Sequence, residues 1–198
     1  DWSSDVCSSD LNMLLRLAAD GRGSLTHQVV GLVDGPMKAR FIAAKVDCRV
    51  VPISSVFEAA RAIKTLRAIV REFDPDVVQG WMYHGNMVAA LVAGAGRKRP
   101  FIWNVRQSLY DLRREKPLTR ALILAGAFFS RRPAAIVYNA HVSRRQHEAI
   151  GYSRGNALHI PNGVETEYFS VQEDLRVRVR EEQRLEGRLV VGMAARRH

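Results

Sequence analysis

Short apolar runs alternate with helical segments along most of this chain, and this alternation constrains the fold more than any other feature. The runs at residues 77–80, 101–105 and 135–138 lack regular polar alternation, and a helical segment separates each from the next. Strands of this kind are buried on both faces, which indicates a parallel sheet covered by helices on each side. The sequence therefore predicts a doubly wound, Rossmann-like α/β domain.

The helix predicted before Asp74 has the clearest periodicity. Its apolar residues recur at spacings of three and four, at Ala59, Ile63, Leu66, Val70 and Phe73. Ser54 or Ser55 is suited to cap its first turn, and Pro75 should end it because proline disfavours helical dihedral angles at the preceding residue. The other predicted helices are 12–19, 36–45, 87–93, 118–129, 140–150 and 173–186, and the other strands are 28–33, 48–53, 157–160 and 189–194.

The first eleven residues differ in character from the rest. Residues 1–11 resemble the in-frame translation of a sequencing-library adapter, so they are left out of the fold prediction. Without their three aspartates the net charge changes from +10 to +13. The strand that should precede the helix at 12–19 is then missing. We expect a gene fragment with one domain at 12–163, a linker and helix at 164–186, and the first strand of a truncated second domain at 187–198.

The composition indicates a soluble globular protein. Of the 198 residues 47% are hydrophobic and 25% are charged, and the apolar run from Ala121 to Phe129 is too short to cross a bilayer. No basic segment followed by an apolar one opens the chain, and two cysteines are too few for a disulfide framework, so the expected compartment is the reducing cytoplasm. Arginine pairs are spread over separate segments, which disfavours nucleic-acid binding. They suit an enzyme near anionic lipid or phosphorylated substrates, and a plain solvated basic surface remains the alternative.

Two strand ends carry most of the candidate binding groups. Trp81, Tyr83, His84 and Asn86 follow the strand at 77–80, before a helix is predicted to resume at Met87. Their rings and hydrogen-bonding groups suit hydroxyl-rich ligands. In open α/β sheets ligands bind beyond the carboxyl ends of the strands, which is where this turn is expected. The alternative is that the aromatic rings close the sheet edge and His84 is a structural histidine.

The next strand ends in a guanidinium and several amides, at Asn104, Arg106, Gln107 and Ser108. Arg106 is suited to bind a phosphate bidentately, or else to pair with a carboxylate at the rim of the sheet. Because neighbouring parallel strands end on the same side, Arg106 and His84 are predicted to line one cleft. Asn139 ends a third strand, where it either caps the following helix or joins this cleft.

No complete catalytic motif is present. Gly94-Ala95-Gly96 lacks the third glycine of a dinucleotide fingerprint, and no phosphate loop, nucleophile elbow or His-Glu-x-x-His sequence occurs. The sequence predicts no metal site.

Three stretches taken together resemble the family-4 glycosyltransferases. They are Pro75-Asp76-Val77-Val78-Gln79 with Trp81-Met82-Tyr83-His84, then Trp103-Asn104-Val105-Arg106-Gln107-Ser108, then Ile160-Pro161-Asn162-Gly163-Val164-Glu165 with Phe169. The resemblance is to the N-terminal domain of this family. It implies two Rossmann-like domains in the GT-B arrangement, an N-terminal one that binds the acceptor and a C-terminal one that binds a UDP- or GDP-sugar. It further implies retention of anomeric configuration without a metal or other cofactor.

The resemblance also implies residue roles. Arg106 and His84 would be catalytic, Arg196 would contact the donor pyrophosphate, and Asn162-Gly163 would form a turn that acts as the interdomain hinge. Arg106 stands where many family members have a histidine, and the Gly-Gly loop that members carry before the first helix is absent.

The expected function is sugar transfer to a glycan or lipid-linked acceptor in envelope polysaccharide synthesis, at the inner face of the cell membrane. The alternatives are a GT-B-fold sugar-nucleotide epimerase and a non-catalytic basic binding module. We expect residues 12–198 alone to be inactive.

Overall fold

The computed structural model describes residues 7–20, 25–53, 55–164, 166 and 170–192. The helices are α1 (Cys7–Ala19), α2 (Met37–Ala43), α3 (Val56–Phe73), α4 (Met82–Val92), α5 (Pro117–Phe129), α6 (His141–Ala149) and α7 (Glu173–Glu182), with a short 3₁₀ helix, η1 (Leu112–Arg114), before α5. The strands are β1 (Gln28–Gly31), β2 (Asp47–Val50), β3 (Val78–Trp81), β4 (Phe101–Val105), β5 (Ala135–Tyr138) and β6 (Ala157–His159). The predicted bounds of two strands, 101–105 and 135–138, agree with those in the structure.

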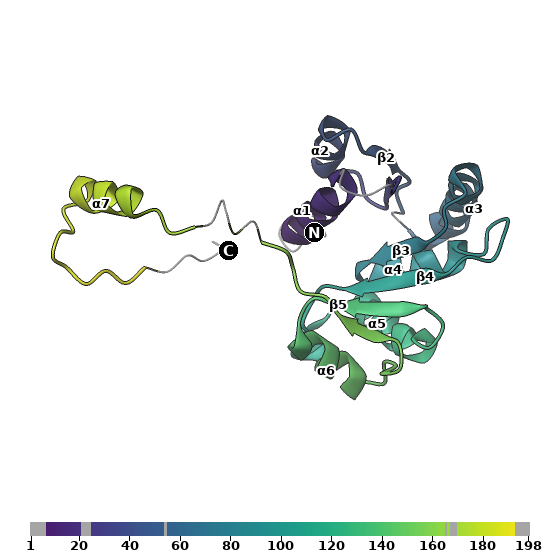
Figure 1. The fold of residues 1–198 in the computed structure, drawn as a ribbon. Coiled ribbons are helices and arrows are strands. Elements are labelled where there is room, and N and C mark those ends of the chain that lie inside the picture. Colours follow the sequence, from purple (N-terminus) through teal and green to yellow (C-terminus); the bar gives the residue numbers. More distant parts are fainter. Residues whose placement is uncertain (1–6, 21–24, 54, 165, 167–169, 193–198) are drawn as a thin grey trace. The chain divides into compact units, whose positions relative to one another are not determined.

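The strands form two parallel sheets. One pairs β1 with β2, and the other has the order β3-β4-β5-β6 (Figure 1). The register pairs Trp81 with Asn104 and Val105 with Tyr138, so the strands of the larger sheet end close to one another. Parallel strands joined by helices confirm the predicted α/β class.

Helix α3 follows its sequence signals closely. Ser55 is the N-cap, and its hydroxyl accepts a hydrogen bond from the Glu58 backbone N–H at 3.3 Å. Leu66 is buried, as the apolar periodicity predicts, whereas Arg61 and Lys64 are exposed. The helix ends at Asp74, which adopts the left-handed conformation with φ 48° immediately before Pro75. The predicted helix stop is therefore confirmed.

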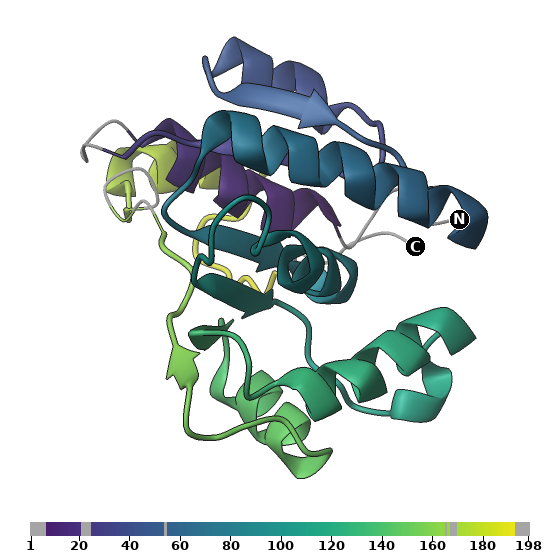
Figure 2. The same ribbon diagram turned by 90° about the vertical axis from the view of Figure 1, so that its right-hand side faces the viewer.

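A cavity of about 810 Å³ is lined by residues of both β1 and β3. Its walls include Leu14 and Leu17 of α1 and Leu66 and Ile69 of α3. Figures 1 and 2 show the ribbons of these two helices. In a right-handed βαβ unit, a strand before α1 would pair with β1. In the common doubly wound order the first strand also pairs with the fourth, and the fourth corresponds to β3 here. The cavity therefore lies where such a strand belongs.

The junction between β3 and α4 corrects the predicted polar turn. Helix α4 begins at Met82, directly after the strand, rather than at Met87. Met82 has φ 61°, which lets the chain turn without loop residues. Gly80 lies against this first turn so closely that an added Cβ would be 2.5 Å from the Asn86 Cα. Tyr83 and Asn86, three residues apart, consequently lie on the inward face of α4, and both are buried.

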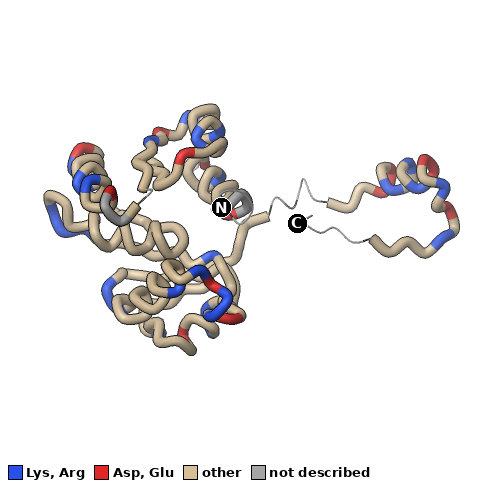
Figure 3. Tube along the Cα trace, turned by 180° about the vertical axis from the view of Figure 1, so that it is seen from behind, with Lys and Arg blue, Asp and Glu red and all other residues tan. Residues whose placement is uncertain are grey.

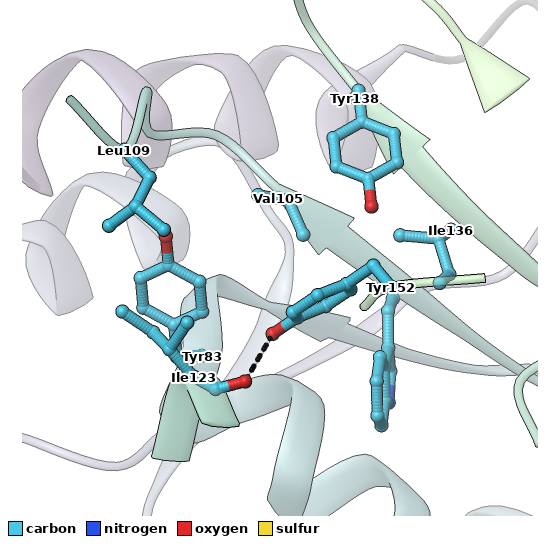
Figure 4. Packing of buried hydrophobic residues seen from close by; sticks show 8 residues of the cluster. Tyr83, Val105, Leu109, Ile123, Ile136, Tyr138 and Tyr152 are labelled. Carbon is cyan, nitrogen blue, oxygen red and sulfur yellow. Dashed lines mark hydrogen bonds between the residues drawn. The ribbon is translucent and has the colours of Figure 1, made fainter. Parts of the chain in front are cut away.

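The core of the larger sheet is aromatic as well as aliphatic. Tyr83, Tyr138 and Tyr152 pack with Ile123 and Ile136 in a cluster of buried residues (Figure 4). The Tyr152 hydroxyl donates a hydrogen bond to the Ile123 carbonyl at 3.1 Å. Burial raises the pKa of all three tyrosines, so they stay neutral. This cluster packs α4, α5 and the segment after α6 against the strands that carry the candidate site.

The ends of the chain differ from expectation. Helix α1 begins at Cys7, within the segment that resembles an adapter, rather than at residue 12. The chain divides into two compact units, residues 1–162 and 163–198, and the second contains α7. No turn occurs at residues 160–164, so the predicted Asn162-Gly163 turn is wrong.

The prediction of a strand at 189–194 is also wrong for residues 189–192, which the structure describes. Residues 189–192 carry no regular secondary structure, and residues 193–194 lie outside the described part, as does Arg196. Among the described residues no helix has the length and apolar character needed to span a bilayer.

Candidate functional site

The candidate site lies at the carboxyl ends of the larger sheet. Trp81 is the last residue of β3, Arg106 follows β4, Asn139 follows β5, and Asn162 comes three residues after β6. Contacts join all four, because Arg106 bonds to both asparagines and lies over the Trp81 ring. The structure thus brings together candidates that the sequence places up to 81 positions apart. This is the edge at which ligands bind in open α/β sheets.

Arg106 is the centre of this site, and its side chain is only 4% exposed. The guanidinium carbon lies 5.0 Å from the centroid of the Trp81 ring, a cation–π arrangement. One terminal nitrogen donates a hydrogen bond to Asn162 Oδ1. Among the described residues Nε makes no hydrogen bond. A buried guanidinium with an unused N–H is a strong site for an anionic oxygen, because burial increases electrostatic attraction.

The anionic partner of Arg106 in this structure is Asp10. Arg106 Nε lies 3.5 Å from Asp10 Oδ1, a distance too long for a well-formed hydrogen bond. Burial raises the pKa of Asp10 by more than its interaction with Arg106 lowers it. Asp10 belongs to the segment that resembles an adapter, so sequence reasoning excluded it. Its carboxylate lies beside the Arg106 guanidinium.

Helix α6 and the end of β5 hold the Arg106 segment in place. Ser143 Oγ donates to the Gln107 carbonyl at 2.7 Å, and the Leu109 backbone N–H donates to Gln146 Oε1 at 2.8 Å. Asn139 Nδ2 donates to the Arg106 carbonyl at 3.4 Å. Asn139 does not cap α6, whose N-cap is Ala140 without a side-chain hydrogen bond, so the capping prediction is wrong.

The other predicted site residues have structural partners. Tyr83 lies in the core with 4% exposure, and its hydroxyl lies 2.8 Å from His147 Nε2, so it does not line an open cleft. Asn86 bonds through both side-chain atoms to the backbone N–H and carbonyl of Asn104, each at 3.0 Å. Gln107 Nε2 donates to Glu115 Oε1 at 2.9 Å.

The remaining predicted residues lie nearby. Asn104 is buried at the end of β4, and Ser108 is half-buried two residues after Arg106. His84 is half-buried in the first turn of α4, and burial lowers its pKa. Its predicted place in one cleft with Arg106 stays a prediction.

Two histidines at this edge were not among the predicted site residues. The rings of His141, at the start of α6, and His159, at the end of β6, are stacked with centroids 3.7 Å apart. His141 comes shortly after β5 and His159 ends β6. A position at the end of a strand is the same sequence feature that identified Arg106. The sequence alone could not predict this contact, because the two histidines are brought together by the register between β5 and β6.

His147 is buried beneath this site and should make stability depend on pH. Its Nδ1 lies 2.8 Å from the Ser143 carbonyl, so Nδ1 carries the proton and Nε2 accepts from Tyr83. Burial lowers the pKa of His147 below 6.5, so the unfolded state binds the proton first as the pH falls. We expect stability to decrease by up to about 1.4 kcal/mol per pH unit below about pH 6.5, and to be flat just above it.

Urea unfolding at about pH 7.5 and about pH 5.5 measures this dependence. His147→Gln should reduce the slope of the unfolding free energy against pH by the contribution of one proton. His84→Gln measures the separate contribution of His84, because burial lowers the pKa of His84 too. Equal stability of the wild-type chain at both pH values would show that His147 is not buried neutral.

The described residues contain no group of three or more His, Cys, Asp or Glu side chains that could hold a metal ion. The side chains of the site itself offer three kinds of interaction. A fixed guanidinium stabilises negative charge, an indole face accepts a sugar ring or base by stacking, and amides bind hydroxyls.

The fold defines a Rossmann-like domain with a buried arginine, Arg106, at the carboxyl edge of its larger sheet. The chain belongs to Glycosyltransferase Family 4, whose family model matches residues 13–168. No curated protein gives a significant sequence match.

Solved structures with the same fold include those of Alr3699/HepE from Anabaena. The complex with UDP has 14% identity and a TM-score of 0.72, and the match covers 88% of this chain and 46% of that one. The complex with UDP and glucose and the complex with UDP-glucose each have 15% identity and a TM-score of 0.70, covering 93% and 94% of this chain. The chain spans about half the length of these proteins, 46% to 49%.

Proposed function

We propose that this chain supplies the acceptor-side domain of a retaining glycosyltransferase, which transfers a sugar from a nucleotide sugar to a glycan or lipid-linked acceptor. The observation that carries the proposal is the buried Arg106 at the carboxyl edge of a family-4 domain, with an aromatic ring on one side and an unused N–H. Donor phosphate leaves this reaction as a charged group. Arg106 would stabilise that charge as it develops, which is the largest contribution in sites of this type.

The other groups of the site suit a sugar. Trp81 holds the guanidinium by its face and offers an apolar surface, while Asn104 and Asn139 offer amides. We propose His84 as a second catalytic residue and Arg196 as a contact to the donor pyrophosphate. The donor would be a UDP- or GDP-sugar. UDP is favoured because the similar Anabaena structures contain it. The reaction as we propose it uses no metal or other cofactor.

The proposed setting is envelope polysaccharide synthesis in the cytoplasm, with peripheral contact to the inner face of the cell membrane. A net charge of +10 supports contact with an anionic surface. Lysines and arginines are distributed over most elements (Figure 3). The domain division at 12–163, 164–186 and 187–198 and the hinge at Asn162-Gly163 stay part of the proposal.

The test is a transfer assay with the complete two-domain enzyme. Radiolabelled UDP- and GDP-sugars are supplied with a membrane extract as acceptor, and label should enter glycan or lipid. Arg106→Gln should lower kcat by about 100-fold, because one charge-stabilising donor is lost. Arg97→Gln is the matched control, since Arg97 is exposed and pairs with Asp74 at the opposite end of β3.

Other outcomes would contradict the proposal. Conversion of the free nucleotide sugar without any acceptor would identify an epimerase. Polyanion binding without sugar transfer would identify a basic binding module. Residues 12–198 alone should transfer no label, because donor-phosphate stabilisation requires both domains to close over it.

A further inference from the structure

Helix α5 exposes an apolar face to solvent. Its only polar residues are Thr119 and Arg120. Ile123 and Gly126 are buried against the core, whereas Leu118, Leu124 and Phe128 are 56%, 48% and 81% exposed. A helix that is apolar all round is normally covered all round. The described residues leave this outward side uncovered.

The exposed residues form one continuous surface. Ala121, Leu124 and Phe128 follow each other at spacings of three and four, so they lie on the same side of the helix. Leu118 extends this surface by a turn toward the start of α5. We call these four residues the α5 face. From Leu118 to Phe128 this surface is about 15 Å long, too continuous to be a scatter of single exposed side chains.

Basic residues flank both ends of the α5 face. Arg113, Arg114 and Lys116 precede α5, and Arg131 and Arg132 follow it. The guanidinium of Arg132 lies 4.9 Å from the Phe129 ring centroid. The one acidic residue of this segment, Glu115, accepts a hydrogen bond from Gln107. From Lys116 to His147 the sequence has no aspartate or glutamate.

We propose that the α5 face and its flanking arginines dock on an anionic lipid surface. Such a surface offers both an apolar layer for Leu124 and Phe128 and negative headgroups for the basic flanks. A second copy of this chain would cover the apolar residues but bring like charges together at both ends, which is unfavourable. This inference rests on the proposed function and names the surface for its membrane contact.

Vesicle flotation with the 198-residue chain tests the surface. The chain should float with phosphatidylglycerol vesicles at about 0.1 M salt and not with phosphatidylcholine vesicles. Leu124→Ser with Phe128→Ser should reduce binding at least about tenfold, because the lost apolar burial scales with area. Both side chains are exposed, so the melting temperature should not fall. Val33→Ser, at a 61% exposed position outside the α5 face, should leave binding unchanged.

Charge reversal separates the electrostatic contribution. Arg131→Glu should reduce binding to phosphatidylglycerol about tenfold, while Arg61→Glu, on the exposed side of α3 and with the same change in net charge, should not. Equal losses for both variants would show non-specific attraction and overturn the proposal. So would a dimer in light scattering that Phe128→Ser dissociates. The flotation experiment contains no nucleotide sugar. A negative result would therefore count against the membrane surface only, and the transfer assay would still test the proposed function.

Discussion

Gly80→Ala should destabilise the domain by about 3 kcal/mol or more, a large part of the stability of an ordinary domain. An added Cβ would lie 2.5 Å from the Asn86 Cα, 2.6 Å from the Gly85 carbonyl oxygen and 2.7 Å from the Asn86 nitrogen. All three are backbone atoms of the first turn of α4, so no side chain can rotate away. The turn would have to move off β3. Urea unfolding followed by circular dichroism measures the loss.

Gly85→Ala is the matched control. It lies in the same βα junction, but its added Cβ would be 3.9 Å from the nearest atom, an ordinary contact. Alanine also has the higher helix propensity, so this variant should be more stable than wild type by about 0.5 to 1 kcal/mol. If both alanine variants changed stability alike, the close packing of β3 against α4 would be wrong.

Asn86→Ala should cost about 2 to 4 kcal/mol, because it leaves two buried backbone groups without partners. The side chain of Asn86 is 3% exposed and satisfies both the N–H and the carbonyl of Asn104 at 3.0 Å. These bonds fix the end of β4, two residues before Arg106. Hydrogen exchange of the Asn104 amide should therefore accelerate more than that of Ile136 in the core.

Two further variants define this effect. Gln79→Ala, at an exposed position of β3, should change stability by less than about 0.5 kcal/mol. Asn86→Asp keeps an acceptor for the Asn104 N–H but places a carboxylate against its carbonyl, so it should destabilise nearly as much as alanine. An Asn86→Ala variant as stable as wild type would contradict the assigned hydrogen bonds.

The sequence could predict the sheet because its strands are apolar and short. Strands β4 and β5 are short and mostly apolar, with Asn104 as the one strongly polar residue, and each is followed directly by a polar residue, so their ends are visible in the sequence. The end of α3 was equally visible, since Pro75 excludes helical geometry at Asp74. Such local steric and burial rules need no knowledge of tertiary contacts.

The first turn of α4 could not be placed in this way. Residues Trp81 to Asn86, which end β3 and begin α4, combine aromatic, polar and glycine residues and therefore resemble a loop in composition. The close approach of Gly80 and the burial of Tyr83 against His147 turn it into a helix. The contact of Tyr83 with His147 joins residues 64 positions apart. The approach of Gly80 to Gly85 and Asn86 is closer in sequence but depends on how the helix packs against the strand. The inward spacing of Tyr83 and Asn86 was the one local signal, and two positions are too few to define a periodicity.

The candidate site was predictable only in part for the same reason. Arg106 was identified because it ends a strand, and strand ends meet at one edge of a parallel sheet. Its contact with Asp10 was hidden, because residues 1–11 were excluded from fold reasoning while α1 in fact begins at Cys7. The stacked pair His141 and His159 depends on strand register and was likewise missed.

The most direct test of the central claim is to follow the Arg106 Nε–H signal by NMR while UDP-glucose is added. In wild type the Asp10 carboxylate lies beside this group, so binding should be weak. Asp10→Ala should lower the apparent Kd for UDP-glucose at least about tenfold and shift the Arg106 signal, whereas glucose should not. Arg106→Gln added to Asp10→Ala removes the signal itself, so titration calorimetry is the measurement for this variant, and the gain in affinity should be lost. A signal that does not move in Asp10→Ala, or that moves equally with glucose, would contradict the assignment of Arg106 as the group that holds the donor phosphate.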